Sequence, residues 1–206
     1  MPKLTAAAAM NPTVETHPLA PFAPANATLL MLGSFPPPRA RWKMDFYYPN
    51  FQNDMWRIFG LVFFGDKDYF VEPGGKAFKE ALIRSFLTER GIAISDTAHQ
   101  VIRLQGNASD KFLQIVKPVD LAALLNIMPN CTTVMTTGEL ATDTLLSLMP
   151  SETAKPSIGR YSETEFAGRP LRLYRLPSSS RAYPLPLAEK AAAYGAFFRE
   201  IGLAKP

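Results

Sequence analysis

Apolar runs and amphipathic stretches alternate along this chain. Residues 28–32 form a continuous apolar run that ends at Gly33, which is typical of a strand buried on both faces. Similar short runs predict strands at residues 92–94, 132–136 and 171–176, each followed by small or polar residues. The pattern therefore predicts four buried strands.

Helices are predicted between and after these strands. Residues 53–59 begin with capping side chains and are expected to end at Gly60, and residues 76–90 are amphipathic with Gly91 as their stop. In the second helix the apolar face is expected to hold Phe78, Leu82, Phe86 and Leu87. Further helices are predicted at residues 120–127, 139–148 and 187–201.

Strands that alternate with helices indicate an α/β fold. We expect a three-layer α/β/α sandwich with a central, mainly parallel four-stranded sheet. Residues 1–26 are rich in Ala and Pro and are expected to form an extended N-terminal arm, and residues 27–206 a single domain. Residues 155–168 are interpreted as a connection.

Composition narrows the classes of function only slightly. The chain has 206 residues and a net charge of +4, which permits an anionic partner without requiring one. A single cysteine, Cys131, excludes an internal disulfide, and with two histidines it leaves little for a metal site. We expect no metal and no cofactor, and an ordinary buried thiol at Cys131. Because no apolar run reaches the roughly 18 residues of a membrane span, we expect a cytoplasmic protein without membrane contact.

The loops that leave the carboxyl ends of parallel strands form the ligand crevice of such folds. Four segments are expected to meet there, at residues 33–36, 95–96, 136–138 and 177–181. No Gly-rich phosphate loop and no G-x-S-x-G nucleophile motif is present, and only His17 and His99 are available as imidazole bases. A serine nucleophile among residues 178–180 is therefore disfavoured.

The remaining indications of function come from aromatic and hydroxyl side chains. Phe46 and Tyr48 offer faces on which a nucleobase could stack, with core packing as the alternative. Ser178, Ser179 and Arg181 could bind phosphates, and the alternatives are a polar turn and an exposed surface charge. Asp96 could assist chemistry at its strand end, although a helix cap or an ion pair is the favoured interpretation. Trp56 is interpreted as core.

Two motifs resemble those of the uracil-DNA glycosylase superfamily, closest to its mismatch-specific and hypoxanthine-DNA glycosylase-like branches. Residues 33–37 (Gly-Ser-Phe-Pro-Pro) and 46–56, which end in Asn-Asp-Met-Trp, resemble the first motif. Residues 176–182 (Leu-Pro-Ser-Ser-Ser-Arg-Ala) resemble the DNA-intercalation loop. Residues 17–22, 106–110 and 136–141 resemble the bacterial lead-in and two intermediate segments. The resemblance spans residues 17–200.

This resemblance implies a monomeric, monofunctional DNA glycosylase of base excision repair, which binds double-stranded DNA, flips a deaminated or mismatched base and hydrolyses its N-glycosidic bond. Phe35 and Leu176 stand where better-known branches carry polar groups, so the resemblance assigns water positioning to Asn53, for which helix capping is the structural alternative. The implied base contacts are Gly33, Ser34, Phe35, Phe46, Tyr48 and Thr137, and the implied DNA contacts are Ser178, Ser179, Ser180 and Arg181. An inactive DNA-binding module and a small-molecule nucleoside hydrolase remain the alternatives.

Overall fold

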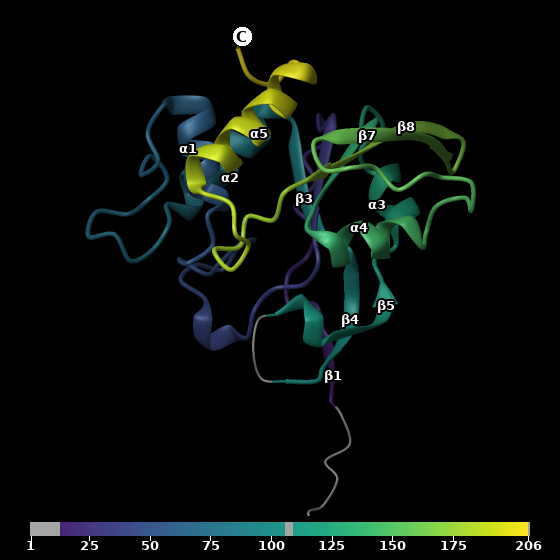
Figure 1. The fold of residues 1–206 in the computed structure, drawn as a ribbon, viewed down its shortest axis with the longest axis horizontal. Helices are drawn as coiled ribbons and strands as arrows, with labels where there is room; N and C mark the ends of the chain where they lie inside the picture. Colours follow the sequence, from purple (N-terminus) through teal and green to yellow (C-terminus); the bar gives the residue numbers. More distant parts are fainter. Residues whose placement is uncertain (1–12, 106–108, 206) are drawn as a thin grey trace, which may run out of the picture.

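The computed structural model describes residues 13–105 and 109–205 (Figure 1). Its central sheet has five strands in the order β3-β2-β6-β8-β7. Four of them are mutually parallel, namely β3 (Ile92–Asp96), β2 (Leu29–Gly33), β6 (Thr133–Thr137) and β8 (Arg169–Leu176). The predicted α/β fold with its parallel four-strand core is confirmed. The fifth strand, β7 (Arg160–Phe166), pairs antiparallel with β8 at the sheet edge, where a connection was predicted.

Helices cover both faces of this sheet, as Figure 1 shows. On one side lie α1 (Met55–Phe64), α2 (Glu80–Arg90) and α5 (Leu187–Glu200), and on the other α3 (Leu121–Asn126) and α4 (Glu139–Leu146). The side chains of β2 alternate between the two layers, so that Leu29 and Met31 face the first set and Leu30 and Leu32 the second. This alternation explains why every residue of the strand is apolar and buried.

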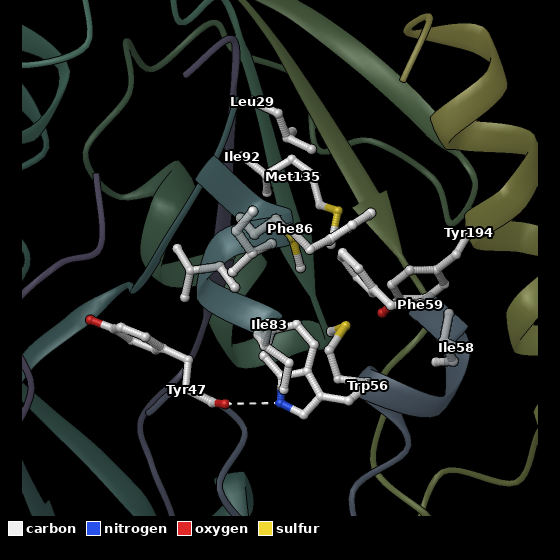
Figure 2. Close-up of a cluster of buried hydrophobic side chains, with 14 of the residues drawn as sticks. Leu29, Tyr47, Trp56, Ile58, Phe59, Ile83, Phe86, Ile92, Met135 and Tyr194 are labelled. Carbon is white, nitrogen blue, oxygen red and sulfur yellow. Dashed lines mark hydrogen bonds between the residues drawn. The ribbon is translucent and has the colours of Figure 1, made fainter. Parts of the chain in front are cut away.

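The larger of the two cores is aromatic (Figure 2). Trp56 is 1% exposed at its centre, stacks on Phe46 at 6.2 Å and donates its indole N–H to the Tyr47 carbonyl at 3.1 Å. The interpretation of Trp56 as core is therefore confirmed. In the opposite layer Cys131 is buried, and burial raises the pKa of its thiol to about 11.

The helices differ from prediction at their ends. Helix α1 continues through Gly60 to Phe64, and the left-handed residue that ends it is Gly65, with φ of 68°. Helix α2 begins only at Glu80, and its buried face consists of Ile83, Phe86 and Leu87. Leu82, which was expected on that face, is 37% exposed.

A second, three-stranded sheet packs beside the first and was not predicted. Its order is β1-β4-β5, with β1 (Val14–Thr16), β4 (Ala98–Arg103) and β5 (Leu113–Pro118) all antiparallel. Two 3-10 turns, η1 (Arg39–Arg41) and η2 (Asp110–Phe112), complete the elements. Residues 13–26 of the expected arm thus contribute a strand, and a bridge from Phe22 to Ile94 ties the rest to the central sheet. Residues 1–12 and 106–108 lie outside the described residues.

Candidate functional site

A cavity of about 590 Å³ opens at the carboxyl ends of β2, β3, β6 and β8. Its volume falls within the roughly 300–1,000 Å³ that is usual for small-molecule sites. Every candidate residue named from the sequence lines this cavity except Phe46: Gly33, Ser34, Phe35, Tyr48, Asn53, Thr137, Ser178, Ser179, Ser180 and Arg181. The crevice is thus where the strand order predicts it.

Gly33 ends β2 at the floor of the cavity. A Cβ at this position would lie 2.5 Å from Asp96 Oδ1 and 3.2 Å from the Tyr48 hydroxyl. The absence of a side chain therefore lets a carboxylate and a phenol approach the backbone of the first loop. The next residue, Ser34, donates its hydroxyl to Asp110 at 2.7 Å.

Two carboxylates line the cavity, and only one of them was considered from the sequence. Asp96 ends β3, is 7% exposed and pairs with His17 Nε2 at 2.8 Å. Asp110 begins η2, and burial raises the pKa of its carboxyl group, with the nearby charge of Asp96 acting in the same direction. Asp96 is therefore hydrogen-bonded to His17, a contact that is an ion pair when the imidazole is protonated, and it also faces the cavity.

Tyr48 is one of the aromatic side chains that line the cavity. Its backbone has φ of 52°, a left-handed conformation that is uncommon for a residue other than glycine. Its hydroxyl shares a hydrogen bond with Thr137 Oγ1 at 3.1 Å, and burial raises the pKa of this phenol well above its ordinary value. Tyr48 is therefore neutral and fixed against Thr137.

Phe46 does not belong to the cavity. It is 1% exposed, stacks on Trp56 and meets Phe22 edge to face at 5.3 Å. Phe46 therefore has the core packing that was the alternative interpretation from the sequence. In the sequence Phe46 and Tyr48 are equivalent aromatic candidates, whereas in the structure Phe46 packs in the core and Tyr48, at a left-handed turn, lines the cavity.

Asn53 stands at the entrance to α1 and also lines the cavity. Its side-chain Oδ1 accepts a hydrogen bond from the Met55 N–H at 2.9 Å, while the N-cap position itself belongs to Asp54. Asn53 therefore fixes the first turn of the helix one residue before the cap. Its backbone bridges to Ser180, which joins the first motif to the second.

The serine-rich loop after β8 is held by internal hydrogen bonds. The Ser180 N–H donates to Ser178 Oγ, and the Ala182 N–H donates to Ser180 Oγ, both at 3.2 Å. Ser179 is 2% exposed, and its carbonyl accepts from the Asp54 N–H at 3.0 Å. Ser179 therefore presents less surface to a ligand than its two neighbours.

A charged cluster beneath this loop was missed by sequence reasoning. Asp54 is buried and accepts from Arg181 Nε at 2.8 Å and from Lys190 Nζ at 3.1 Å. Lys190 also donates to the Ser180 carbonyl at 2.7 Å. Because Asp54 and Lys190 lie 136 residues apart, no local pattern signals this pair.

Among the described residues, no group of three His, Cys, Asp or Glu side chains is arranged as a metal site would require. No described helix has both the length and the apolar character needed to cross a membrane.

The fold is similar to that of a solved structure. The solution NMR structure of a candidate uracil DNA glycosylase from Methanosarcina acetivorans matches this chain with a TM-score of 0.62 and 20% sequence identity. The match covers 92% of this chain and 99% of that one. At this identity the similarity establishes a shared fold, which is the fold that the two motifs led us to expect. No protein-family model matches the sequence, and the search of curated proteins found no match either.

Proposed function

We propose that this chain is a monofunctional DNA glycosylase, which flips a deaminated or mismatched base out of DNA and hydrolyses its N-glycosidic bond in base excision repair. The observation that carries the proposal is the cavity, which joins the first loop, Asn53 and the serine-rich loop in one place. The likeness in fold to the candidate uracil DNA glycosylase supports it. The base would be uracil, hypoxanthine or xanthine.

The cavity has parts suited to each task of this reaction. Cleavage leaves a cation-like sugar and a base anion, which needs hydrogen-bond donors, and it requires a positioned water. We assign contacts with the base oxygen to the backbone at Ser34 and Phe35, and stacking to Tyr48. Asn53 would hold the water by hydrogen bonding. Ser178, Ser180 and Arg181, at the rim, would grip the displaced strand.

The lining of the cavity also favours hydrolysis over a covalent route. Glycosylases that cut the strand as well need an amine that forms a Schiff base with the sugar, and lysine is the side chain that supplies it. None of the described residues that line the cavity is a lysine. We therefore expect abasic DNA with an intact strand as the product.

A panel of duplexes tests this proposal. Each duplex carries one uracil, hypoxanthine or xanthine, with an undamaged duplex and the free nucleosides as controls. We expect base release from at least one damaged duplex, seen as a strand break only after alkali treatment. Binding without release on every duplex would instead indicate an inactive DNA-binding module, and cleavage of free nucleosides alone would indicate a nucleoside hydrolase.

A further inference from the structure

His17 and Asp96 form a nearly buried pair beside the cavity. His17 Nε2 lies 2.8 Å from Asp96 Oδ2, and the two side chains are 6% and 8% exposed. Asp96 lines the cavity, and its other oxygen, Oδ1, lies where a side chain at Gly33 would be. One carboxylate oxygen is thus bound by the imidazole, and the other lies against the floor of the site.

The histidine ring is fixed on every side. It meets Phe35 edge to face at 5.2 Å and stacks on Tyr47 at 5.8 Å. Its Nδ1 lies 3.1 Å from the Leu19 N–H and 2.9 Å from the Leu19 carbonyl. A neutral ring accepts from that N–H and a protonated ring donates to that carbonyl, so Nε2 can donate to Asp96 in both charge states.

Hydrolysis of an N-glycosidic bond needs a group that can accept a proton from the attacking water. The amide of Asn53 can orient a water, but it is far too weak a base to remove its proton. A carboxylate can take that proton, and its negative charge also stabilises a cation-like sugar. Of the two carboxylates that described residues place at the cavity, Asp96 has an imidazole donor, whereas Asp110 accepts from the Ser34 hydroxyl.

We propose that Asp96 is a catalytic residue of this site and that His17 is the positioning residue that holds it. This inference rests on the proposed glycosylase function. Water adds to C1′ of the sugar and gives one proton to Asp96, while the bond from C1′ to the base nitrogen breaks and its electron pair leaves with the base. The proton then reaches the departed base through solvent, so one water is consumed and Asp96 is regenerated.

The electrostatic surroundings of Asp96 come from four side chains. His17 faces it from the segment after β1, Tyr47 and Tyr48 from the loop before α1, and Asp110 from η2. Both phenols are neutral because burial raises their pKa values well above the ordinary range. The charged or hydrogen-bonding neighbours of Asp96 are therefore His17, which can donate to its carboxylate, and Asp110, whose negative charge is repelled by it.

The test compares one variant of Asp96 and two variants of His17 in single-turnover base release from the best duplex of the panel. Asp96→Asn keeps the size of the side chain and an oxygen acceptor for His17, but it loses the charge. His17→Gln keeps an N–H donor near Nε2, and His17→Phe removes it. Circular dichroism, urea unfolding and DNA affinity are measured for each variant, so that loss of folding is separated from loss of chemistry.

We expect Asp96→Asn to slow release by roughly 10²- to 10⁴-fold with DNA affinity within about threefold of wild type. His17→Phe should slow release, and His17→Gln should recover most of it.

An Asp96→Asn variant that keeps the wild-type rate of base release would overturn the inference while leaving the glycosylase function intact. Equal rates for folded His17→Gln and His17→Phe would overturn the role of His17. If the wild-type chain releases no base from any duplex, the proposed function and this inference both fail. Should Asp96→Asn fail to fold, the comparison of base release by the two His17 variants still tests the inference, since His17 acts only through Asp96.

Discussion

Lys190 and Asp54 form an ion pair of 3.1 Å in which the lysine side chain is 1% exposed and the aspartate side chain 8%. Lys190 lies in α5, whereas Asp54 caps α1. Lys190 also donates to the Ser180 carbonyl, so one ammonium group ties the last helix to both motif segments of the cavity. A buried charge is tolerated only when such partners replace its hydration.

Replacing Lys190 with Met should therefore be strongly destabilising. The change leaves the Asp54 carboxylate with Arg181, whose side chain is half exposed, and it leaves the Ser180 carbonyl without its donor. Removal of one partner from a buried pair costs about 3–5 kcal/mol in the free energy of unfolding. Urea denaturation measures this value.

Lys155→Met is the matched control. Lys155 also pairs with two acidic groups, Glu139 and Asp143, but these pairs lie at the surface. Surface pairs of this kind contribute about 1 kcal/mol or less. Similar losses in the two variants would show that burial does not govern the Lys190 pair.

Arg181→Ala should weaken DNA binding and reduce its dependence on salt. Arg181 uses Nε on Asp54, while its side chain is 48% exposed at the cavity rim. Loss of one phosphate contact lowers the slope of log affinity against log salt by about 1. Titrations at several salt concentrations give this slope.

The control for this arginine is Arg172→Ala, which removes the same charge from an exposed position in β8 that pairs with Glu163. It should leave the salt slope unchanged. A slope that falls equally in both variants would point to net charge, and a slope unchanged in Arg181→Ala would exclude a phosphate contact there.

Asn53→Ala should abolish base release while leaving DNA binding within about threefold of wild type. We expect the rate of release to fall by roughly 100-fold or more, since the hydrogen bond that holds the water is lost. The variant also loses the hydrogen bond from Met55 N–H, which costs about 1 kcal/mol of stability. Single-turnover assays and thermal unfolding measure the two effects.

Asn53→Ser separates capping from chemistry, because a serine oxygen can accept the same N–H. The expected result is recovered stability with activity still low. Recovery of both in Asn53→Ser would show that Asn53 acts only through the helix, and full activity of Asn53→Ala would end its catalytic assignment.

The strands that could be predicted are those with a continuous apolar pattern. Residues 29–32 are buried on both sides by necessity, because helices cover both faces of a parallel sheet. Strand β7 has no such signal, since it lies at an edge and buries none of its side chains fully. From the sequence alone, an edge strand that consists largely of charged and hydroxyl residues cannot be distinguished from a loop that connects two elements.

The site, too, has parts that could be predicted from the sequence and parts that could not. Its location follows from strand order, so Gly33, Thr137 and the serine-rich loop were named correctly as neighbours. Its pairs of ionisable side chains could not be predicted from the strand order. His17 and Asp96, for example, lie 79 residues apart and meet only when residues 13–26 pack on the sheet. Charge pairing over such distances depends on tertiary contacts that no local pattern encodes.

Gly60 shows that a glycine near a helix end can have either of two structural roles. A glycine at the end of an apolar stretch is usually a left-handed helix stop, yet α1 runs through Gly60 and ends at Gly65. The reason for glycine here is space, because a Cβ at position 60 would lie 2.2 Å from the Asp66 carbonyl oxygen. The chain after α1 folds back onto its own helix at this point.

Gly60→Ala should therefore destabilise the protein, although alanine is the better helix former. Alanine gains about 1 kcal/mol in helix propensity, but the clash is with backbone and must move the turn after α1, which costs about 1–3 kcal/mol. The control is Gly195→Ala in α5, where the nearest atom is the end of the Arg199 side chain at 3.2 Å. Because that side chain can move aside, Gly195→Ala should be neutral or stabilising by up to about 1 kcal/mol. Urea unfolding of both variants measures the difference, and a stabilised Gly60→Ala would contradict the close approach of the Asp66 carbonyl to the helix.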